Sequence, residues 1–297
     1  MLTTKRKIAL ARVLSFAIVG ARALAGRSSR VIARRRDVNW ELELNEGIDL
    51  AIYLGLYQRI PARAARWITP GALVFDIGAN IGAHTLPFAR AMGPDGIVVA
   101  VEPTDYAFSR LRANAALNPD LLPRLTLLQA ALTAQSNGPG PKDHARFYAR
   151  WPLKGGGTDR HRKHLGELET AKGARFLTLD ALVQEMRAKH RNRPIAFVKL
   201  DVDGHELDVL RGATQLLTAQ KPPILIEIGP HVQDEVPALR AAHPDIGAPR
   251  LPARDRRYRQ KTSDVGTGAE SLDRRRCDHR RHRTHRHRKP LAGSRLG

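Results

Sequence analysis

The sequence predicts an α/β fold in which a mostly parallel, Rossmann-like sheet is covered by helices on both faces. Three short apolar runs, residues 73–75, 96–101 and 195–200, are typical of parallel strands buried on both faces. Apolar residues at helical spacing follow each run, as in successive β-α-β units. An acidic residue follows each run. Ligands bind at the carboxyl ends of such strands, so we expect the functional site there.

The first run leads into a turn with the pattern D-x-G-x-x-x-G, formed by Asp76, Gly78 and Gly82 with Asn80 between the glycines. Glycine allows a sharp turn and the close approach of a ligand. A dinucleotide-binding turn has three glycines, so the missing glycine disfavours an NAD-dependent oxidoreductase. A carboxylate beside the turn suits a cationic ligand such as S-adenosylmethionine (SAM). We predict that these four residues bind SAM; a strand–helix turn without a ligand is the alternative.

Two further positions are predicted to contact the cofactor. Glu102 stands at the tip of the second run, followed by Pro103, where an acidic residue holds a ribose diol in related topologies. A surface glutamate before a turn is the alternative. Residues 125–132 are expected to form a third buried strand, and the turn that contains Ala131 would then lie near an adenine ring.

A second acidic cluster follows the run at residues 195–200. Asp201 could hold the SAM amine, a substrate hydroxyl or a cation, and His205 is a candidate general base because imidazole titrates near neutral pH. Glu206 completes the predicted catalytic set. Helix capping by Asp203 and Glu206, and a solvent-facing His205, are the alternatives. Glu227 ends a fifth run. Asp201, Glu206 and Glu227 could approach one another and hold a divalent metal ion through their oxygens, but the sequence does not establish such a site, and no metal is predicted.

Net charge is distributed unevenly along the chain. The formal charge of +21 resides in residues 1–36, which carry +10, and residues 250–297, which carry +11, whereas residues 37–249 are neutral. A neutral central region argues against a basic nucleic-acid groove in the catalytic domain, so no specific nucleic-acid partner is expected. The single cysteine, Cys277, excludes an intrachain disulfide framework. A reducing, cytoplasmic location is predicted.

The N-terminal residues combine basic and apolar character. Residues 8–21 are mostly apolar but are interrupted by Arg12, and they are too short for a transmembrane helix. Ala23-Leu24-Ala25 resembles a signal-peptide cleavage site, but the surrounding arginines disfavour that interpretation. We predict a basic helix that packs on the domain or contacts an anionic membrane through residues 5–36; a frayed helical extension is the alternative. Residues 37–70, with a half-exposed strand at 40–44, are predicted to cap the cofactor.

These motifs together resemble those of the FkbM-type methyltransferases over about residues 40–235. The resemblance implies a class I SAM-dependent methyltransferase sheet and O-methylation of a hydroxyl on a sugar or secondary metabolite, hence a small-molecule or glycan substrate. It implies that Asp76, Gly78 and Glu102 bind SAM and that Asp201 and Glu206 lie in the active-site cleft. Members often carry glutamate after the tyrosine that matches Tyr57, whereas this chain has Gln58. A catalytically impaired protein that binds anionic membranes or nucleic acid through its basic ends is therefore the alternative function.

The C-terminal residues do not continue the α/β pattern. Residues 250–297 are basic, low in complexity and without apolar periodicity, so we expect them to be disordered. A nucleic-acid-binding arm, a histidine metal tract or a reading-frame shift near residue 245 could each account for them; the frame shift is favoured, and the sheet would then lack its last two strands. The expected organisation is an extension at 1–36, a cap at 37–70, a methyltransferase domain at 71–245 and a tail at 246–297.

Overall fold

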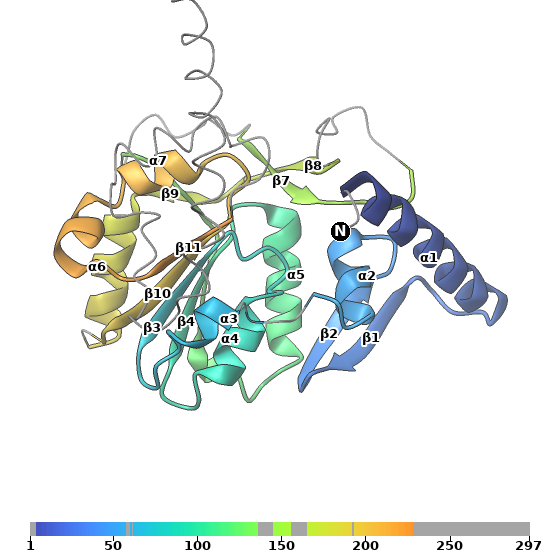
Figure 1. Cartoon of the computed structure of the whole chain (residues 1–297), viewed down its shortest axis with the longest axis horizontal. Helices are drawn as coiled ribbons and strands as arrows, with labels where there is room; N and C mark the ends of the chain where they lie inside the picture. Colours follow the sequence, from blue (N-terminus) through green and yellow to red (C-terminus); the bar gives the residue numbers. More distant parts are fainter. Residues whose placement is uncertain are drawn as a thin grey trace, which may run out of the picture. The chain divides into compact units, whose positions relative to one another are not determined.

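The computed structural model describes residues 4–57, 60, 62–135, 145–155, 165–191 and 193–227. All of these belong to the first of the two units into which the chain divides, residues 1–246. Gln58, the expected tail and any strands after Glu227 lie outside the described residues. The fold of the first unit is α/β, with the sheet between layers of helices (Figure 1).

A five-stranded parallel sheet forms the centre of the fold. Its strands run in the order β11-β10-β3-β4-β5, and every neighbouring pair is parallel. Their bounds are β3 Leu73–Ile77, β4 Ile97–Val101, β5 Leu125–Leu128, β10 Ile195–Leu200 and β11 Ile224–Ile226. The three apolar runs of the sequence analysis thus form three adjacent strands, and the predicted doubly wound sheet is confirmed.

Alternate side chains of the central strands enter two different apolar layers. Phe75, Val99 and Leu200 pack with α6 (Leu179–Lys189) and α7 (Glu206–Arg211) on one face. Val74 and Val98 pack on the other face with α4 (Thr85–Ala91) and α5 (Asp105–Ala116). Burial on both faces explains why these strands appear in the sequence as continuous apolar runs. Short helical turns at η1 (Leu122–Arg124) and η2 (Leu216–Gln220) complete the connections.

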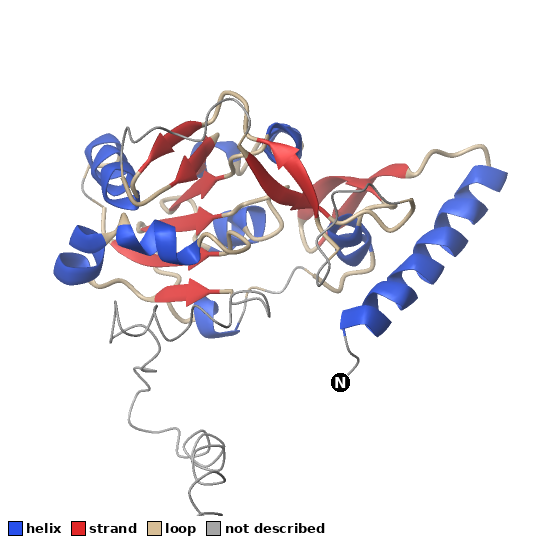
Figure 2. Ribbon diagram, turned by 90° about the horizontal axis from the view of Figure 1, so that it is seen from above, coloured by secondary structure: helices blue, strands red, loops and turns tan. Residues whose placement is uncertain are grey.

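The N-terminal segment forms helix α1 (Thr4–Leu24) and an antiparallel hairpin of β1 (Arg30–Arg35) and β2 (Val38–Glu43), followed by α2 (Gly47–Tyr53) and α3 (Ala62–Ala65). From the sequence, residues 30–35 are expected to belong to the helical extension, but the structure shows that they form a strand. Trp40 of β2 is buried against the α4 face of the sheet. The backbone N–H groups of Asn39 and Glu41 donate to Asn118 and Asn114, which fixes the hairpin at the end of α5. Figure 2 shows α1 at the outside of this segment.

The expectation of one strand over residues 125–132 is wrong. β5 ends at Leu128, and β6 (Ala130–Leu132) leaves the central sheet to pair in parallel with β9 (Arg175–Leu177). Gln129 stands at the break, where its side-chain amide donates to Asp105 and to the carbonyl of Lys172. β7 (Arg146–Arg150) and β8 (Glu167–Thr170) form an antiparallel pair. The diversion of the chain at Gln129 brings β6 to the edge of the functional site.

Candidate cofactor and active site

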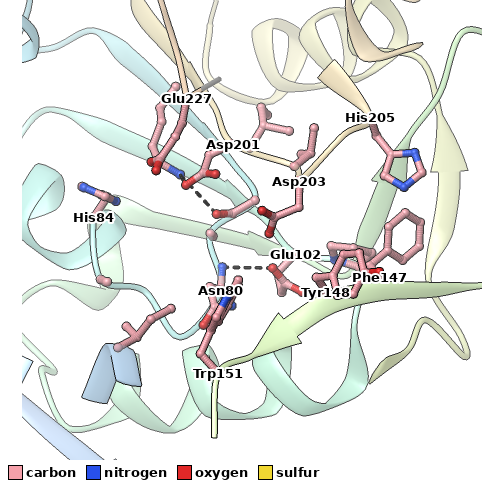
Figure 3. Close-up of a pocket in the computed structure, with 18 of the residues that line it drawn as sticks. Asn80, His84, Glu102, Phe147, Tyr148, Trp151, Asp201, Asp203, His205 and Glu227 are labelled. Atoms are coloured by element: carbon pink, nitrogen blue, oxygen red, sulfur yellow. Dashed lines mark hydrogen bonds and ion pairs between the residues drawn. The ribbon is translucent and has the colours of Figure 1, made fainter. Parts of the chain in front are cut away.

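A cavity of about 460 Å³ opens at the carboxyl ends of β3, β4 and β10. The strand order reverses between β3 and β10, which is the position where open α/β sheets bind ligands. Side chains from the tips of these strands, from β6 and from β7 converge on this cavity, and α1 contributes to its wall (Figure 3). The cavity lies at the strand ends where the sequence predicts the functional site.

The turn after β3 is shaped by Gly78, which has a φ of 78°. A Cβ at this position would lie 1.7 Å from the backbone oxygen of Asp201. The loops after β3 and β10 therefore pass each other closely only because residue 78 has no side chain. Gly78 also lines the cavity, and its carbonyl accepts a hydrogen bond of 3.2 Å from the Lys199 ammonium.

Two residues of the predicted cofactor set face away from the cavity, which corrects the expectation of direct contact. Asp76 is fully buried: its Oδ2 accepts a 2.6 Å hydrogen bond from Thr85, and its Oδ1 lies 3.2 Å from Lys199 Nζ as an ion pair without hydrogen-bond geometry. Gly82 packs against α5, where a Cβ would lie 2.8 Å from a methyl carbon of Leu111. Both residues form the turn rather than a ligand surface.

Glu102 reaches the cavity from the tip of β4. Its Oε1 accepts hydrogen bonds from the Thr104 N–H and hydroxyl at 3.0 and 2.7 Å, and its Oε2 accepts from the Asn80 N–H at 3.0 Å. Burial raises the pKa of Glu102, although these hydrogen bonds act in the opposite direction. Asn80 adopts a φ of 49°, and its side-chain amide donates to the Ala149 carbonyl of β7. Hydrogen bonds thus connect Glu102 to Asn80, and Asn80 to strand β7, in one corner of the cavity.

Lys199, at the end of β10, places a positive charge at the centre of the site. Its Nζ lies 3.2 Å from carboxylate oxygens of both Asp76 and Asp201. Burial alone would lower the pKa of Lys199, but the two carboxylates outweigh burial and raise it. The lysine therefore remains charged and holds Asp201 at the cavity wall. Lys199 lies in the strand predicted at residues 195–200, but the sequence alone does not assign it this role.

The acidic groups at this end of the sheet outnumber the nearby cation. Burial and the charges of Asp201, Glu206 and Glu227 raise the pKa of Asp203 to about 7. The pKa of Glu227 is raised by the charge of Asp201 first and by burial second. Asp201, Asp203 and Glu227 all line the cavity beside Lys199 (Figure 3). This part of the site is suited to a ligand with positive charge.

His205 and Glu206, both predicted to be catalytic, occupy different environments. His205 is exposed at the cavity rim, with its ring centre 5.1 Å from that of Phe147. Glu206 is buried and does not line the cavity; its two carboxylate oxygens accept hydrogen bonds from the N–H groups of Val202 and Gly204. The structure corrects the expectation for Glu206, because its oxygens face the loop backbone and not the cavity. Glu206 therefore stabilises the loop before α7, and its side chain does not cap the helix as the alternative had it.

Another part of the cavity wall is apolar and aromatic. Ala131 lines the cavity, as predicted, but it does so from β6 rather than from the central sheet. Five residues outside the predicted site set also line the cavity: Tyr57, His84, Phe147, Tyr148 and Trp151. The Tyr57 and His84 rings lie 5.4 Å apart, and burial lowers the pKa of His84 to about 4, so this imidazole is neutral.

Within the described residues, no group of three or more His, Cys, Asp or Glu side chains is arranged to hold a metal ion. The idea that Asp201, Glu206 and Glu227 form one oxygen-ligand site is not supported, because Glu206 is turned toward the backbone of its own loop. The cavity therefore consists of an acidic side around Lys199, a Glu102 corner and an aromatic wall.

A family model described as "Methyltransferase FkbM domain" matches residues 76–252, more than half of the chain. The chain belongs to the FkbM methyltransferase family. The matched residues begin within β3 and include every strand tip that forms the cavity. The family resemblance predicted from the motifs is confirmed. No match was found among curated proteins.

Solved structures, two methyltransferases among them, are similar to parts of this FkbM chain. The methyltransferase FkbM from Methylobacillus flagellatus KT is 17% identical, covering 60% of this chain and 39% of that one, with a TM-score of 0.37. A SAM-dependent methyltransferase from Aquifex aeolicus is 12% identical over 58% and 64% of the two chains, with a TM-score of 0.30. M. jannaschii TYW2, solved with AdoMet, is 21% identical over 34% and 43%, with a TM-score of 0.24. This chain covers less than two thirds of each of these structures.

Proposed function

We propose that the chain is a SAM-dependent methyltransferase that transfers a methyl group to a hydroxyl oxygen of a sugar or secondary metabolite. The observation that carries the proposal is the pairing of two carboxylate positions across one cavity. Glu102 stands at the tip of β4, and Asp201 stands next to Lys199 at the tip of β10. Membership of a methyltransferase family supports the same reaction.

The chemistry of the cavity fits SAM. Glu102 is the candidate acceptor for the ribose hydroxyls, as acids at the second strand tip are in related folds. The adenine would lie against the small apolar surface of Ala131, which lines the cavity from β6. The amino group and the sulfonium are positive, and Asp201, Asp203 and Glu227 provide the negative surroundings that such groups need. When bound, SAM supplies an electrophilic methyl group on sulfur.

The residues of this chain would orient the acceptor and receive its proton. Asp201 is held by Lys199 and is available to accept a hydrogen bond from a hydroxyl group. Asp203, with a pKa raised to about 7, is half deprotonated near neutral pH and is the second candidate to take the proton. His205 at the rim, beside Phe147, is a third. Holding the hydroxyl in a fixed orientation accounts for much of the rate gain that such enzymes achieve.

The acceptor class is proposed from the wall of the cavity. Phe147, Tyr148 and Trp151 present rings on which the apolar face of a sugar or a flat metabolite can stack. The single cysteine of the chain supports a reducing compartment, so we propose that the reaction occurs in the cytoplasm. The alternative function, that of a catalytically impaired protein, depends on Gln58, which lies outside the described residues.

A methyl-transfer screen tests the proposal. The purified full chain is incubated with methyl-labelled SAM and a panel of sugars and hydroxylated metabolites, and products are analysed for O-methyl groups by mass spectrometry. We expect labelled O-methyl ethers with the wild-type chain and at least a ~100-fold loss of turnover for Asp201→Asn. Asp208→Asn, which changes a carboxylate of the same segment outside the cavity, is the matched control and should retain activity. Methylation on nitrogen or carbon alone would contradict the O-methyl assignment.

A further inference from the structure

Helix α1 exposes large apolar side chains on the side that faces away from the domain. Leu10, Val13, Phe16 and Leu24 have between 51% and 94% of their surface exposed. The spacing of three residues between Leu10, Val13 and Phe16 places them on one side of the helix. We call these four residues the outer face of α1. Large exposed apolar patches mark interaction surfaces when they are contiguous.

The opposite side of α1 is fixed against the domain, so the outer face cannot turn inward. The Ser15 hydroxyl is buried and donates a 2.9 Å hydrogen bond to the Leu44 carbonyl at the end of the β1–β2 hairpin. Ile18 and Val19 pack on the apolar layer that contains Trp40 and Leu42. A helix that is apolar on all sides is normally covered on all sides. In α1, the described part of the chain covers only the side that carries Ser15, Ile18 and Val19.

The positive charge around α1 indicates which kind of partner can cover the outer face. Residues 1–36 carry +10 without a single acidic residue. A second copy of the chain would bring another +10 to the same contact, and the chain's own residues 250–297 carry +11. Like charges at such proximity oppose both contacts. An anionic lipid surface offers apolar acyl chains together with negative headgroups, which complements both properties of α1.

We propose that the outer face of α1 docks on an anionic lipid bilayer. The helix lies in the plane of the interface, with Leu10, Val13 and Phe16 inserted among the acyl chains and the basic residues at the headgroups. None of the helices in the described part of the chain has the length and apolarity needed to cross a membrane. Docking parallel to the surface is therefore the mode that this helix permits.

This docking surface lies close to the proposed active site. Lys7, Ile8 and Ala11 of the same helix line the cavity. The cavity wall and the outer face are therefore separated by no more than the width of one helix, about 10 Å. A bound bilayer would hold the cavity near the lipid headgroups. The inference stands on the surface of α1 and does not require that the methyl transfer proposed above be correct.

Vesicle co-sedimentation of the full chain tests the proposal. Wild-type protein is mixed with phosphatidylcholine vesicles with and without phosphatidylglycerol. We expect binding only to the anionic vesicles, and a loss of about tenfold or more for the triple variant Leu10→Ser, Val13→Ser, Phe16→Ser. Leu122→Ser, which removes an exposed leucine outside α1, is the matched control and should bind like wild type. All variants keep the full charge, so equal binding by the triple variant would show that charge alone attracts the chain and would overturn the proposal.

A labelling experiment checks the orientation of α1 without destabilising it. The chain has one cysteine, so the background variant Cys277→Ser allows a single environment-sensitive probe at Val13→Cys or, as a control, at Leu122→Cys. Anionic vesicles should blue-shift the emission of the probe at residue 13 and leave the probe at residue 122 unchanged. No shift at residue 13, or a dimer in solution that the triple variant disperses while vesicle binding is absent, would overturn the proposal.

Discussion

The ammonium group of Lys199 lies 3.2 Å from the carboxylate of Asp76, and both side chains are buried at the centre of the sheet. This contact links the glycine turn after β3 to the acidic loop after β10, the two loops that flank the cavity. The acid of the glycine motif thus pairs with a lysine of another strand, and only the lysine lines the cavity.

We expect Lys199→Met to destabilise the fold by about 3–5 kcal/mol, because it leaves the buried Asp76 carboxylate without its cation. The double variant Lys199→Met, Asp76→Asn should recover part of this loss, since the fully buried carboxylate is then neutral while the partly exposed Asp201 still lacks the lysine. Urea unfolding measures both free energies. Lys189→Met, at an exposed position of α6, is the control and should change stability by less than about 0.5 kcal/mol. Equal stability of Lys199→Met and wild type would contradict the role of the pair.

Gly78→Ala should destabilise the fold severely. The new Cβ would lie 1.7 Å from the Asp201 carbonyl oxygen, and the φ of 78° is itself unfavourable for alanine. Gly93 has a similar φ of 72°, but a Cβ added there would have no atom within 4 Å, so Gly93→Ala carries only the backbone cost of about 1 kcal/mol. The difference between the two variants, measured by thermal unfolding, should exceed about 3 kcal/mol. Equal effects would show that the two loops have room to separate.

Asp203 should make stability depend on pH. Its pKa rises from an ordinary value of 3.8 to about 7 in the folded chain, so the folded state retains a proton that the unfolded state has lost between these values. The unfolding free energy should therefore fall as the pH rises through this window and level off above it, by on the order of 3 kcal/mol. Asp203→Asn should flatten this part of the curve. Urea unfolding of the wild type and of Asp203→Asn is compared at about pH 5 and about pH 8. This comparison isolates the contribution of Asp203, because Glu227 and Glu206 are present in both proteins. A curve unchanged by the substitution would contradict the buried, proton-binding environment of Asp203.

Glu206→Ala should lower stability by about 1–2 kcal/mol and leave turnover per folded molecule nearly unchanged. The glutamate accepts two backbone hydrogen bonds within its own loop and does not line the cavity. Asp201→Asn should show the reverse pattern, with a large loss of turnover. Chemical unfolding and methyl-transfer rates measured on the same samples separate the two roles. A Glu206→Ala protein that is fully stable but inactive would restore Glu206 to the catalytic set.

The strand positions and the location of the cavity were predictable because burial on both faces leaves uninterrupted apolar runs such as residues 73–75 and 195–200. The direction of individual side chains was not. Asp76 is turned inward by Thr85 and Lys199, and Lys199 lies more than a hundred residues away. The break at Gln129 depends on pairing between β6 and β9, which are also far apart in sequence. Local patterns do not contain such contacts.

The contribution of the N-terminal segment was predicted only in outline. Tyr57, from the segment expected to cap the cofactor, lines the cavity, and so does Ile8 of α1, which no sequence motif marks. The arrangement arises because Ser15 and Trp40 fix the helix and the hairpin to the domain at positions far along the chain. Only tertiary packing reveals it.

Calorimetric titration of the full chain with SAM tests the central claim, that the cavity between Glu102 and Asp201 is a SAM site. We predict one site per chain for SAM, no heat of binding with NAD, and affinity at least ~10-fold weaker for Glu102→Ala, which removes the proposed ribose acceptor. Glu185→Ala, at the surface of α6 and outside the cavity, should titrate like wild type. Absence of SAM binding by the folded wild-type chain, or undiminished affinity in Glu102→Ala, would contradict the account.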